Sequence, residues 1–102
     1  MQLNIKNRLL IVNLLPKEGS ILEQQMCKEI GTKVELSPEL IEHIELKKDE
    51  NNIHWNAEKE EILEVCFSAP EVSILKGIVE KLDKEGKVNP ENLDLCLEIK
   101  KL

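Results

Sequence analysis

The chain has 102 residues, of which 41% are hydrophobic and 33% are charged. This length is typical of one compact domain, and the composition is too apolar for a disordered tail and too charged for a membrane protein. The 14 Lys and Arg side chains against 20 Asp and Glu give a net charge of −6, which excludes a basic, histone-like binder. We therefore expect a single compact domain over residues 1–102.

Charge is distributed unevenly along the chain. Residues 1–34 have a net charge of +2, from five basic and three acidic side chains, whereas residues 35–102 have a net charge of −8, from nine Lys and 17 acidic side chains. An acidic surface keeps a small domain soluble, and this is the simpler interpretation. The alternative is an acidic face that binds a basic partner or takes the place of nucleic acid.

Side chains that read nucleic acids are scarce. Arg8 is the only arginine, and Trp55 and Phe67 are the only aromatic residues. Arginine forks recognise phosphate and guanine, and aromatic side chains provide the platforms on which bases stack. We therefore do not expect nucleic acid as a partner.

Cysteine usage and hydropathy indicate a cytoplasmic location. Cys27, Cys66 and Cys96 form no CxxC pair, and the longest uninterrupted apolar run is Leu9–Val12. A bilayer requires about 20 apolar residues, and no signal-peptide pattern occurs near the N-terminus. We expect reduced thiols that fill the core as small apolar groups, no membrane partner and a cytoplasmic protein.

The first segment is predicted as a helix. Apolar side chains from Ile5 onward recur every three or four residues, Asn4 can cap the start, and Pro16 stops the helix at Leu15. A strand over Leu9–Val12 is the alternative, but polar residues on both sides of this run favour a helix.

Two further helices follow. Ser20 and Glu23 form a capping box that begins a helix over Ile21–Ile30, and Gly31 suits the left-handed position after its end. Ser37 is an N-cap for a short third helix, which has a proline at its first position and buries Leu40, Ile41 and Ile44.

The pattern then changes to a period of two. Residues 44–48 and 53–56 alternate in polarity around an Asn-rich break at residues 50–52, which predicts a β-hairpin. After a connecting turn over Ala57–Glu61, Leu63, Val65 and Phe67 point to one side of a third strand. The other side has Ile62, Glu64 and Cys66.

Two helices complete the chain. A second capping box, Ser68 with Glu71, begins a helix over Pro70–Glu85 that Gly86 ends. Asn89-Pro90-Glu91 starts the last helix, and we expect one face of it to have Leu93, Leu97 and Lys100, with Cys96 beside them.

The order of elements is ααα-βββ-αα. We therefore predict an α+β fold, with a small three-stranded antiparallel sheet packed by helices. The order of helices and hairpin is also that of a winged helix, in which the third helix enters the major groove. Residues 39–45 of that helix contain three glutamates and no Lys or Arg, so they would repel phosphate.

Residues with catalytic potential form no recognisable constellation. His43 is expected on the polar side of the short helix and His54 on the outer face of the hairpin, with no nucleophile placed beside either. Cysteines and histidines are too scattered for a zinc site, and no Walker loop, GxSxG or HExxH motif occurs. We predict no catalytic, cofactor-binding or metal-binding residues, and a protein that is not an enzyme.

Carboxylates and the tryptophan provide the candidate partner-binding residues. Glutamates occur on the third helix and in the turn Ala57–Glu61, where solvation alone also accounts for them. Trp55 shares a face with Ile53, which favours burial in the core, although a tryptophan on a hairpin can also anchor an interface. The candidates are Glu39, Glu42, Trp55, Glu58, Glu60 and Glu61.

Two stretches carry a resemblance to a known group of proteins. They are RLLIVNLLPKEGS, residues 8–20, and LDKEGKV, residues 82–88, which is followed by Leu93. With a tryptophan between them on a Glu- and Lys-rich hairpin, the chain resembles small proteins of similar length, without a known activity, that tailed bacteriophages and prophages encode. The resemblance covers most of the chain and implies a phage context in a bacterial cytoplasm.

Three functions remain open from the sequence. The first is a non-enzymatic module that binds a host or phage protein. The second is an acidic inhibitor or nucleic-acid mimic directed at a host nucleic-acid-handling or defence complex, and the third is a winged-helix DNA-binding protein. The apolar stripes of helices Ile21–Ile30 and Pro70–Glu85 serve either the core or a homodimer interface.

Overall fold

Capping side chains mark where helices begin in the computed structural model, which describes residues 1–50 and 52–102. The predicted caps Asn4, Ser20, Ser37 and Ser68 each accept a hydrogen bond from a backbone N–H in the first turn of the following helix. These bonds satisfy N–H groups that have no partner within the helix. In chain order the elements are β1 (Gln2–Leu3), α1 (Ile5–Leu14), α2 (Ile21–Val34), α3 (Pro38–His43), β2 (Lys47–Lys48), β3 (Ile53–His54), the 3₁₀ helix η1 (Ala57–Lys59), β4 (Leu63–Glu64), α4 (Ala69–Lys84) and α5 (Leu93–Lys100).

Both predicted ends of α4 are confirmed. Ser68 Oγ accepts from the Glu71 N–H at 3.4 Å, and Glu71 Oε1 accepts from the Ser68 N–H at 2.7 Å, so the capping box is complete. Gly86 has a φ of 64°, and the Lys87 N–H donates to the Leu82 carbonyl at 2.8 Å, which closes the C-terminus as a Schellman motif. Within the described residues, no helix is both long enough and apolar enough to cross a membrane.

The predicted three-stranded sheet is wrong in its pairing. Strands β2 and β3 form a separate antiparallel hairpin, whereas β4 pairs with the N-terminal strand β1, with Leu3 opposite Leu63. The α-amino group of Met1 extends this second ladder by donating to the Val65 carbonyl at 2.9 Å. The third strand therefore does not continue the hairpin, and the order required for a winged helix is not reproduced.

The alternation predicted around β4 is confirmed. Val65 is buried and Leu63 and Phe67 are half-buried, so this side faces the core. The opposite side is exposed and consists of Ile62, Glu64 and Cys66. The Asn-rich break predicted at residues 50–52 includes Asn51, which lies outside the described residues.

Helix α2 continues to Val34, one turn beyond the end predicted at Ile30. Gly31 is helical, because the apolar period continues through Ile30 and Val34, which are both fully buried. The end of α2 is closed by a side chain from α1. Arg8 donates from Nε to the Val34 carbonyl at 2.9 Å and from Nη2 to the Glu35 carbonyl.

Helix α5 starts later than predicted. Asn89 does not begin the helix but closes a turn, in which its Oδ1 accepts from the Glu91 N–H at 2.9 Å, and α5 starts at Leu93. Leu93, Leu97 and Lys100, which the prediction grouped on one face, are exposed. The residues that α5 buries are Leu95, Cys96 and Ile99.

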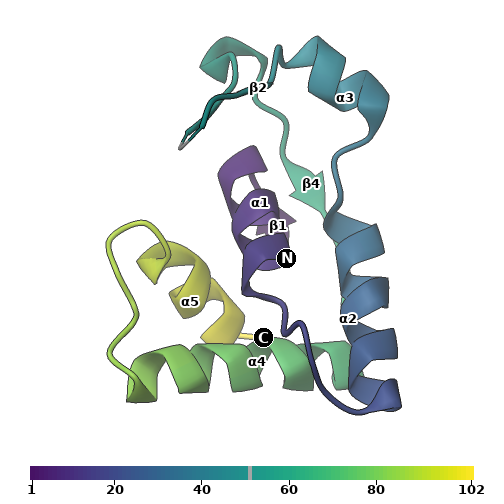
Figure 1. Cartoon of the computed structure of the whole chain (residues 1–102), viewed down its shortest axis with the longest axis vertical. Coiled ribbons are helices and arrows are strands. Elements are labelled where there is room, and N and C mark those ends of the chain that lie inside the picture. The colour runs from purple at the N-terminus through teal and green to yellow at the C-terminus, as the bar shows by residue number, and fades with distance from the viewer. Residues whose placement is uncertain (51) are drawn as a thin grey trace.

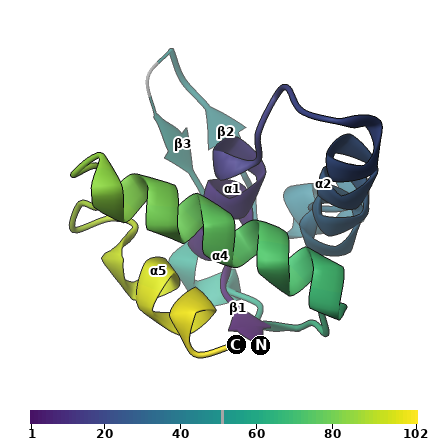
Figure 2. The same cartoon turned by 90° about the horizontal axis from the view of Figure 1, so that it is seen from below.

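The hydrophobic residues form two clusters, one at each end of the long axis (Figure 1). The main body, residues 1–34 and 63–102, consists of α1, α2, α4, α5 and the β1–β4 ladder, and α4 crosses beneath the other helices (Figure 2). The α3–hairpin lobe, residues 35–62, packs on the start of α1. The main-body core consists of Leu3, Ile11, Ile30, Val34, Val65, Leu75, Val79, Leu95, Cys96 and Ile99. The lobe cluster consists of Ile5, Leu40 and Ile44, flanked by Leu9, Leu36, Leu46 and Trp55.

An ion pair between the exposed Lys33 and the buried Glu71 joins α2 to the start of α4. Glu71 is 1% exposed, and its Oε1 accepts from both Lys33 Nζ and the Ser68 N–H. Burial raises the pKa of the Glu71 carboxyl, but the hydrogen bonds from Lys33 and Ser68 outweigh this effect and lower the pKa below its ordinary value. Glu71 is therefore ionised inside the main body.

Candidate functional site

Most of the predicted partner-binding carboxylates lie exposed on the α3–hairpin lobe. Glu39 and Glu42 are on α3, Glu58 is on η1, and Glu61 follows η1. Within the described part of the chain, none of these four side chains takes part in a salt bridge. The fold therefore places them on one end of the molecule, with their charge facing solvent.

The net charge of the chain is concentrated in this lobe. Residues 35–62 contain nine Asp and Glu against three Lys, a net charge of −6. The main body contains eleven acidic and eleven basic side chains, so its net charge is zero. The division between acidic and neutral halves therefore follows the boundary between the two hydrophobic clusters.

Glu60 and Trp55 fasten the lobe to the main body. Glu60 Oε1 accepts from the Ile5 N–H at 2.8 Å, and its Oε2 accepts from the Trp55 Nε1–H at 3.3 Å. The half-buried Trp55 ring packs against the cluster of Ile5, Leu40 and Ile44. These two predicted partner-binding residues thus have structural contacts at the joint.

Arg8 lies beneath the lobe and is committed to the backbone. Burial lowers the pKa of its guanidinium, and the nearby Glu61 carboxylate opposes that effect. Its hydrogen bonds to the carbonyls of Val34 and Glu35 fix the point where the chain enters the lobe.

Glu45 has a backbone conformation that residues other than glycine rarely adopt. Its φ is 58°, in the left-handed region, and the Leu46 N–H donates to the Ile41 carbonyl at 3.1 Å, so α3 ends as α4 does. Asn56 donates to the Glu45 carboxylate at 3.3 Å and Lys59 at 3.4 Å, and these bonds lower the pKa of that carboxyl. The strained residue thus ties α3 to the segment after the hairpin.

The two histidines occupy the exposed positions that the sequence indicates. His43 is exposed at the end of α3. His54 is exposed on β3, with its Nε2 3.3 Å from Asp49 Oδ2. Among residues 1–50 and 52–102, no group of three or more His, Cys, Asp or Glu side chains is arranged to hold a metal ion.

The cysteines differ from one another in burial. Cys27 and Cys96 are buried, and this burial raises the pKa of both thiols, as expected for apolar fillers of the core. Cys66 is exposed, which corrects the expectation that all three thiols fill the core. It lies on the outward side of the segment after β4, one residue away from the inward-facing Val65.

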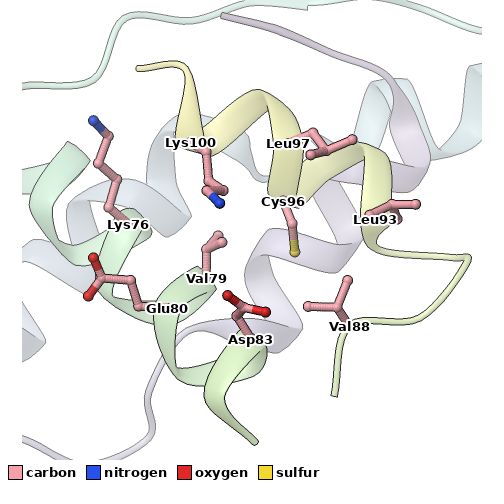
Figure 3. A pocket seen from close by; sticks show the side chains of 9 residues that line it. All are labelled: Lys76, Val79, Glu80, Asp83, Val88, Leu93, Cys96, Leu97 and Lys100. Atoms are coloured by element: carbon pink, nitrogen blue, oxygen red, sulfur yellow. The ribbon is translucent and has the colours of Figure 1, made fainter. Parts of the chain in front are cut away.

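A groove between α4 and α5 is a feature that the sequence did not indicate. Its volume is about 360 Å³, and its apolar lining consists of Val79, Val88, Leu93, Cys96 and Leu97. Val79 and Cys96 point into the space between the two helices (Figure 3). The groove forms only when α4 and α5 pack together, so no pattern within either segment indicates it.

Four charged side chains surround this groove. Lys76 and Lys100 lie toward one end, whereas Asp83 lies toward the other end and Glu80 lies on the α4 edge (Figure 3). Within the described residues, none of the four takes part in a salt bridge. The groove therefore has an apolar floor and a rim that is positive at one end and negative at the other.

No protein family profile, curated protein or solved structure matches the chain. The resemblance to small phage-encoded proteins therefore stays a prediction, and function is argued from the geometry.

Proposed function

We propose that this chain is a non-enzymatic protein-binding module whose α3–hairpin lobe docks onto a basic surface of a host or phage protein. The observation that carries the proposal is the segregation of charge. The lobe has a net charge of −6 and the main body a net charge of zero. A charge that served solubility alone would have no reason to be confined to one end of the molecule.

The exposed carboxylates provide the attraction. Glu39, Glu42, Glu58 and Glu61 are exposed, and within the described residues none of them takes part in a salt bridge that a basic partner would first have to break. A concentrated field of one sign also accelerates association and orients the two molecules as they approach.

The attachment of the lobe supports binding by holding these carboxylates in place. Glu60 bridges Ile5 and Trp55, and Glu45 bridges Asn56 and Lys59. A surface that is already ordered loses less conformational entropy when it binds.

A second candidate is a nucleic-acid mimic, in which the basic surface is the nucleic-acid-binding site of the partner. The same concentration of carboxylates on one lobe favours it. A competition experiment with duplex DNA distinguishes the two candidates. DNA displaces a mimic from the nucleic-acid-binding site of its partner, but it leaves a complex at another surface of the partner intact.

Direct binding of DNA by α3 is disfavoured by the same charges. Glu39 and Glu42 on α3 would face phosphates that they repel. A gel-shift experiment with duplex DNA at low salt tests this third possibility, and we expect no shift.

The test compares three immobilised proteins in one bacterial lysate. They are the native chain, a lobe variant with Glu39, Glu42, Glu58 and Glu61 changed to Gln, and a control with Glu18, Glu29, Glu91 and Glu98 changed to Gln. Both variants lose four exposed carboxylates, so they have the same net charge. Ionic strength is raised from about 0.05 M to about 0.5 M, and captured proteins are quantified by mass spectrometry.

We expect the native chain and the control to capture the same basic protein, with at least a tenfold loss on the lobe variant and a steep decline with salt. Equal capture by all three proteins, or capture that is independent of salt, contradicts the proposal.

A further inference from the structure

We propose that a second copy of this chain occupies the α4–α5 groove, in a twofold dimer with α4 antiparallel to α4 of the other copy. This inference concerns the end of the molecule opposite to the α3–hairpin lobe and does not depend on the proposed function. It rests on the charge pattern of the rim, the apolar residues of the groove and the neutrality of the main body.

Lys76 and Asp83 are complementary positions of the rim, whereas Glu80 lies beside the axis and faces its own copy. Lys76 and Asp83 are seven residues apart on α4, which places them on the same face of the helix about 10.5 Å apart along its axis. A twofold axis that crosses the groove at right angles reverses its direction in the second copy. Lys76 of each copy then faces Asp83 of the other, and the same contact forms twice.

The apolar residues fit the same axis. Leu97 is 48% exposed and Leu93 is 44% exposed, although both belong to a helix that also buries three residues. Leu97 lines the groove from α5, between Leu93 and Lys100 along that helix, and the axis brings it near its own copy. Leu93 lies toward the negative end and packs against the aliphatic stem of Lys100 from the other copy.

The distribution of charge permits this association. The main body has no net charge, and the whole net charge of −6 lies in the lobe at the far end of the long axis (Figure 1). Two copies joined through α4 and α5 therefore keep their acidic lobes apart, and repulsion between them is screened over a distance longer than the Debye length of about 8 Å at physiological salt. The dimer presents two acidic lobes that point away from each other.

The first test measures mass by sedimentation equilibrium from about 5 µM to about 500 µM. We expect the native chain to convert from monomer to dimer over this range and Leu97→Asp to remain a monomer. Leu22→Asp is the matched control, because Leu22 is an exposed leucine on α2 outside the groove, and it dimerises like the native chain. Circular dichroism checks that each variant is folded. A native chain that stays monomeric, or a Leu97→Asp variant that dimerises normally, overturns the proposal.

The second test exchanges charges and separates this dimer from other arrangements. Lys76→Asp alone places Asp opposite Asp twice, and Asp83→Lys alone places Lys opposite Lys twice, so each weakens the dimer at least tenfold. An equimolar mixture of the two variants restores association as a heterodimer, because every contact again pairs Asp with Lys. The double variant restores the homodimer for the same reason. Failure of both combinations to restore association contradicts the antiparallel arrangement.

A charge control accompanies this series. Lys84→Asp changes the same charge on the same helix outside the groove, and we expect native dimerisation from it. A loss equal to that of Lys76→Asp shows that net charge, not position, governs association, and counts against the proposal.

Discussion

The main body and the α3–hairpin lobe differ in the size of their hydrophobic clusters. Within the described residues, the main-body cluster has ten buried hydrophobic side chains from β1, α1, α2, α4, α5 and the segment around β4. The lobe cluster has three, and one of these, Ile5, belongs to α1. Stability in a protein differs between regions according to the apolar surface that each buries. The comparison teaches that the main body determines folding, whereas the lobe depends on it and carries the charge.

The largest expected effect comes from a cavity in the main body. Leu75 on α4 is 1% exposed, so Leu75→Ala loses buried methyl groups that the surrounding helices cannot replace. We expect the free energy of unfolding to fall by about 3 kcal/mol in urea denaturation. Leu22→Ala, at an exposed leucine, changes it by less than about 0.5 kcal/mol. A similar decrease in the free energy of unfolding for both variants contradicts the assignment of Leu75 to the core.

A cavity in the lobe is expected to act locally. Ile44 is fully buried, but its cluster is small, so Ile44→Ala opens the lobe before the main body unfolds. We expect a loss of about 2 kcal/mol in the opening free energy, measured by amide hydrogen exchange. Protection should fall in α3 and β3 and stay native in α4. Equal loss of protection in α4 shows that the two regions unfold as one.

The ion pair between Lys33 and the buried Glu71 predicts a dependence of stability on pH. Glu71 has a lowered pKa in the folded protein, so its contribution is present above its ordinary value of 4.5 and is lost as the pH falls through the folded value. Lys33→Met leaves the carboxylate buried without its cation and lowers the free energy of unfolding by about 2 kcal/mol at neutral pH. The deficit should shrink as the pH falls through the folded-state pKa of Glu71, because a protonated carboxyl has no charge for Lys33 to compensate. A deficit that is constant with pH shows that Lys33 contributes packing only.

The smallest effects on stability are expected at two helix C-termini of the same type. Gly86 and Glu45 both have a positive φ after a helix, but one position has glycine and the other does not. Gly86→Ala places a side chain in the left-handed conformation and destabilises the main body by about 1 kcal/mol. Glu45→Gly relieves the same strain in the lobe and should raise its protection against hydrogen exchange, whereas Glu45→Ala should lower it, because Ala keeps the strain and loses the contacts with Asn56 and Lys59. Identical responses of both Glu45 variants show that the side-chain contacts decide.

Local signals in the sequence predicted most helix starts and the ends of α1 and α4. Asn4, Ser20, Ser37 and Ser68 act on backbone groups within three residues of themselves, so their effect is visible without tertiary contacts. Gly86 behaves in the same way. Gly31 does not, because Ile30 and Val34 extend the buried face past it and Arg8, distant in sequence, closes the helix.

Non-local pairing and orientation could not be predicted. Nothing local to Leu3 indicates a strand, and its partner Leu63 is sixty residues away. Helix α5 has apolar residues around most of its surface, so periodicity alone does not choose which face is buried. The acidic excess was located in residues 35–102 from the sequence, but its confinement to the lobe became visible only when the chain was folded.

The chain crosses between the main body and the lobe at two points. The chain leaves the main body at Val34, which Arg8 holds, and returns at Leu63, which pairs with Leu3. Both crossings are therefore secured by the same short N-terminal stretch. A substitution between residues 35 and 62 that spares the contacts of Ile5 therefore leaves both points of attachment intact.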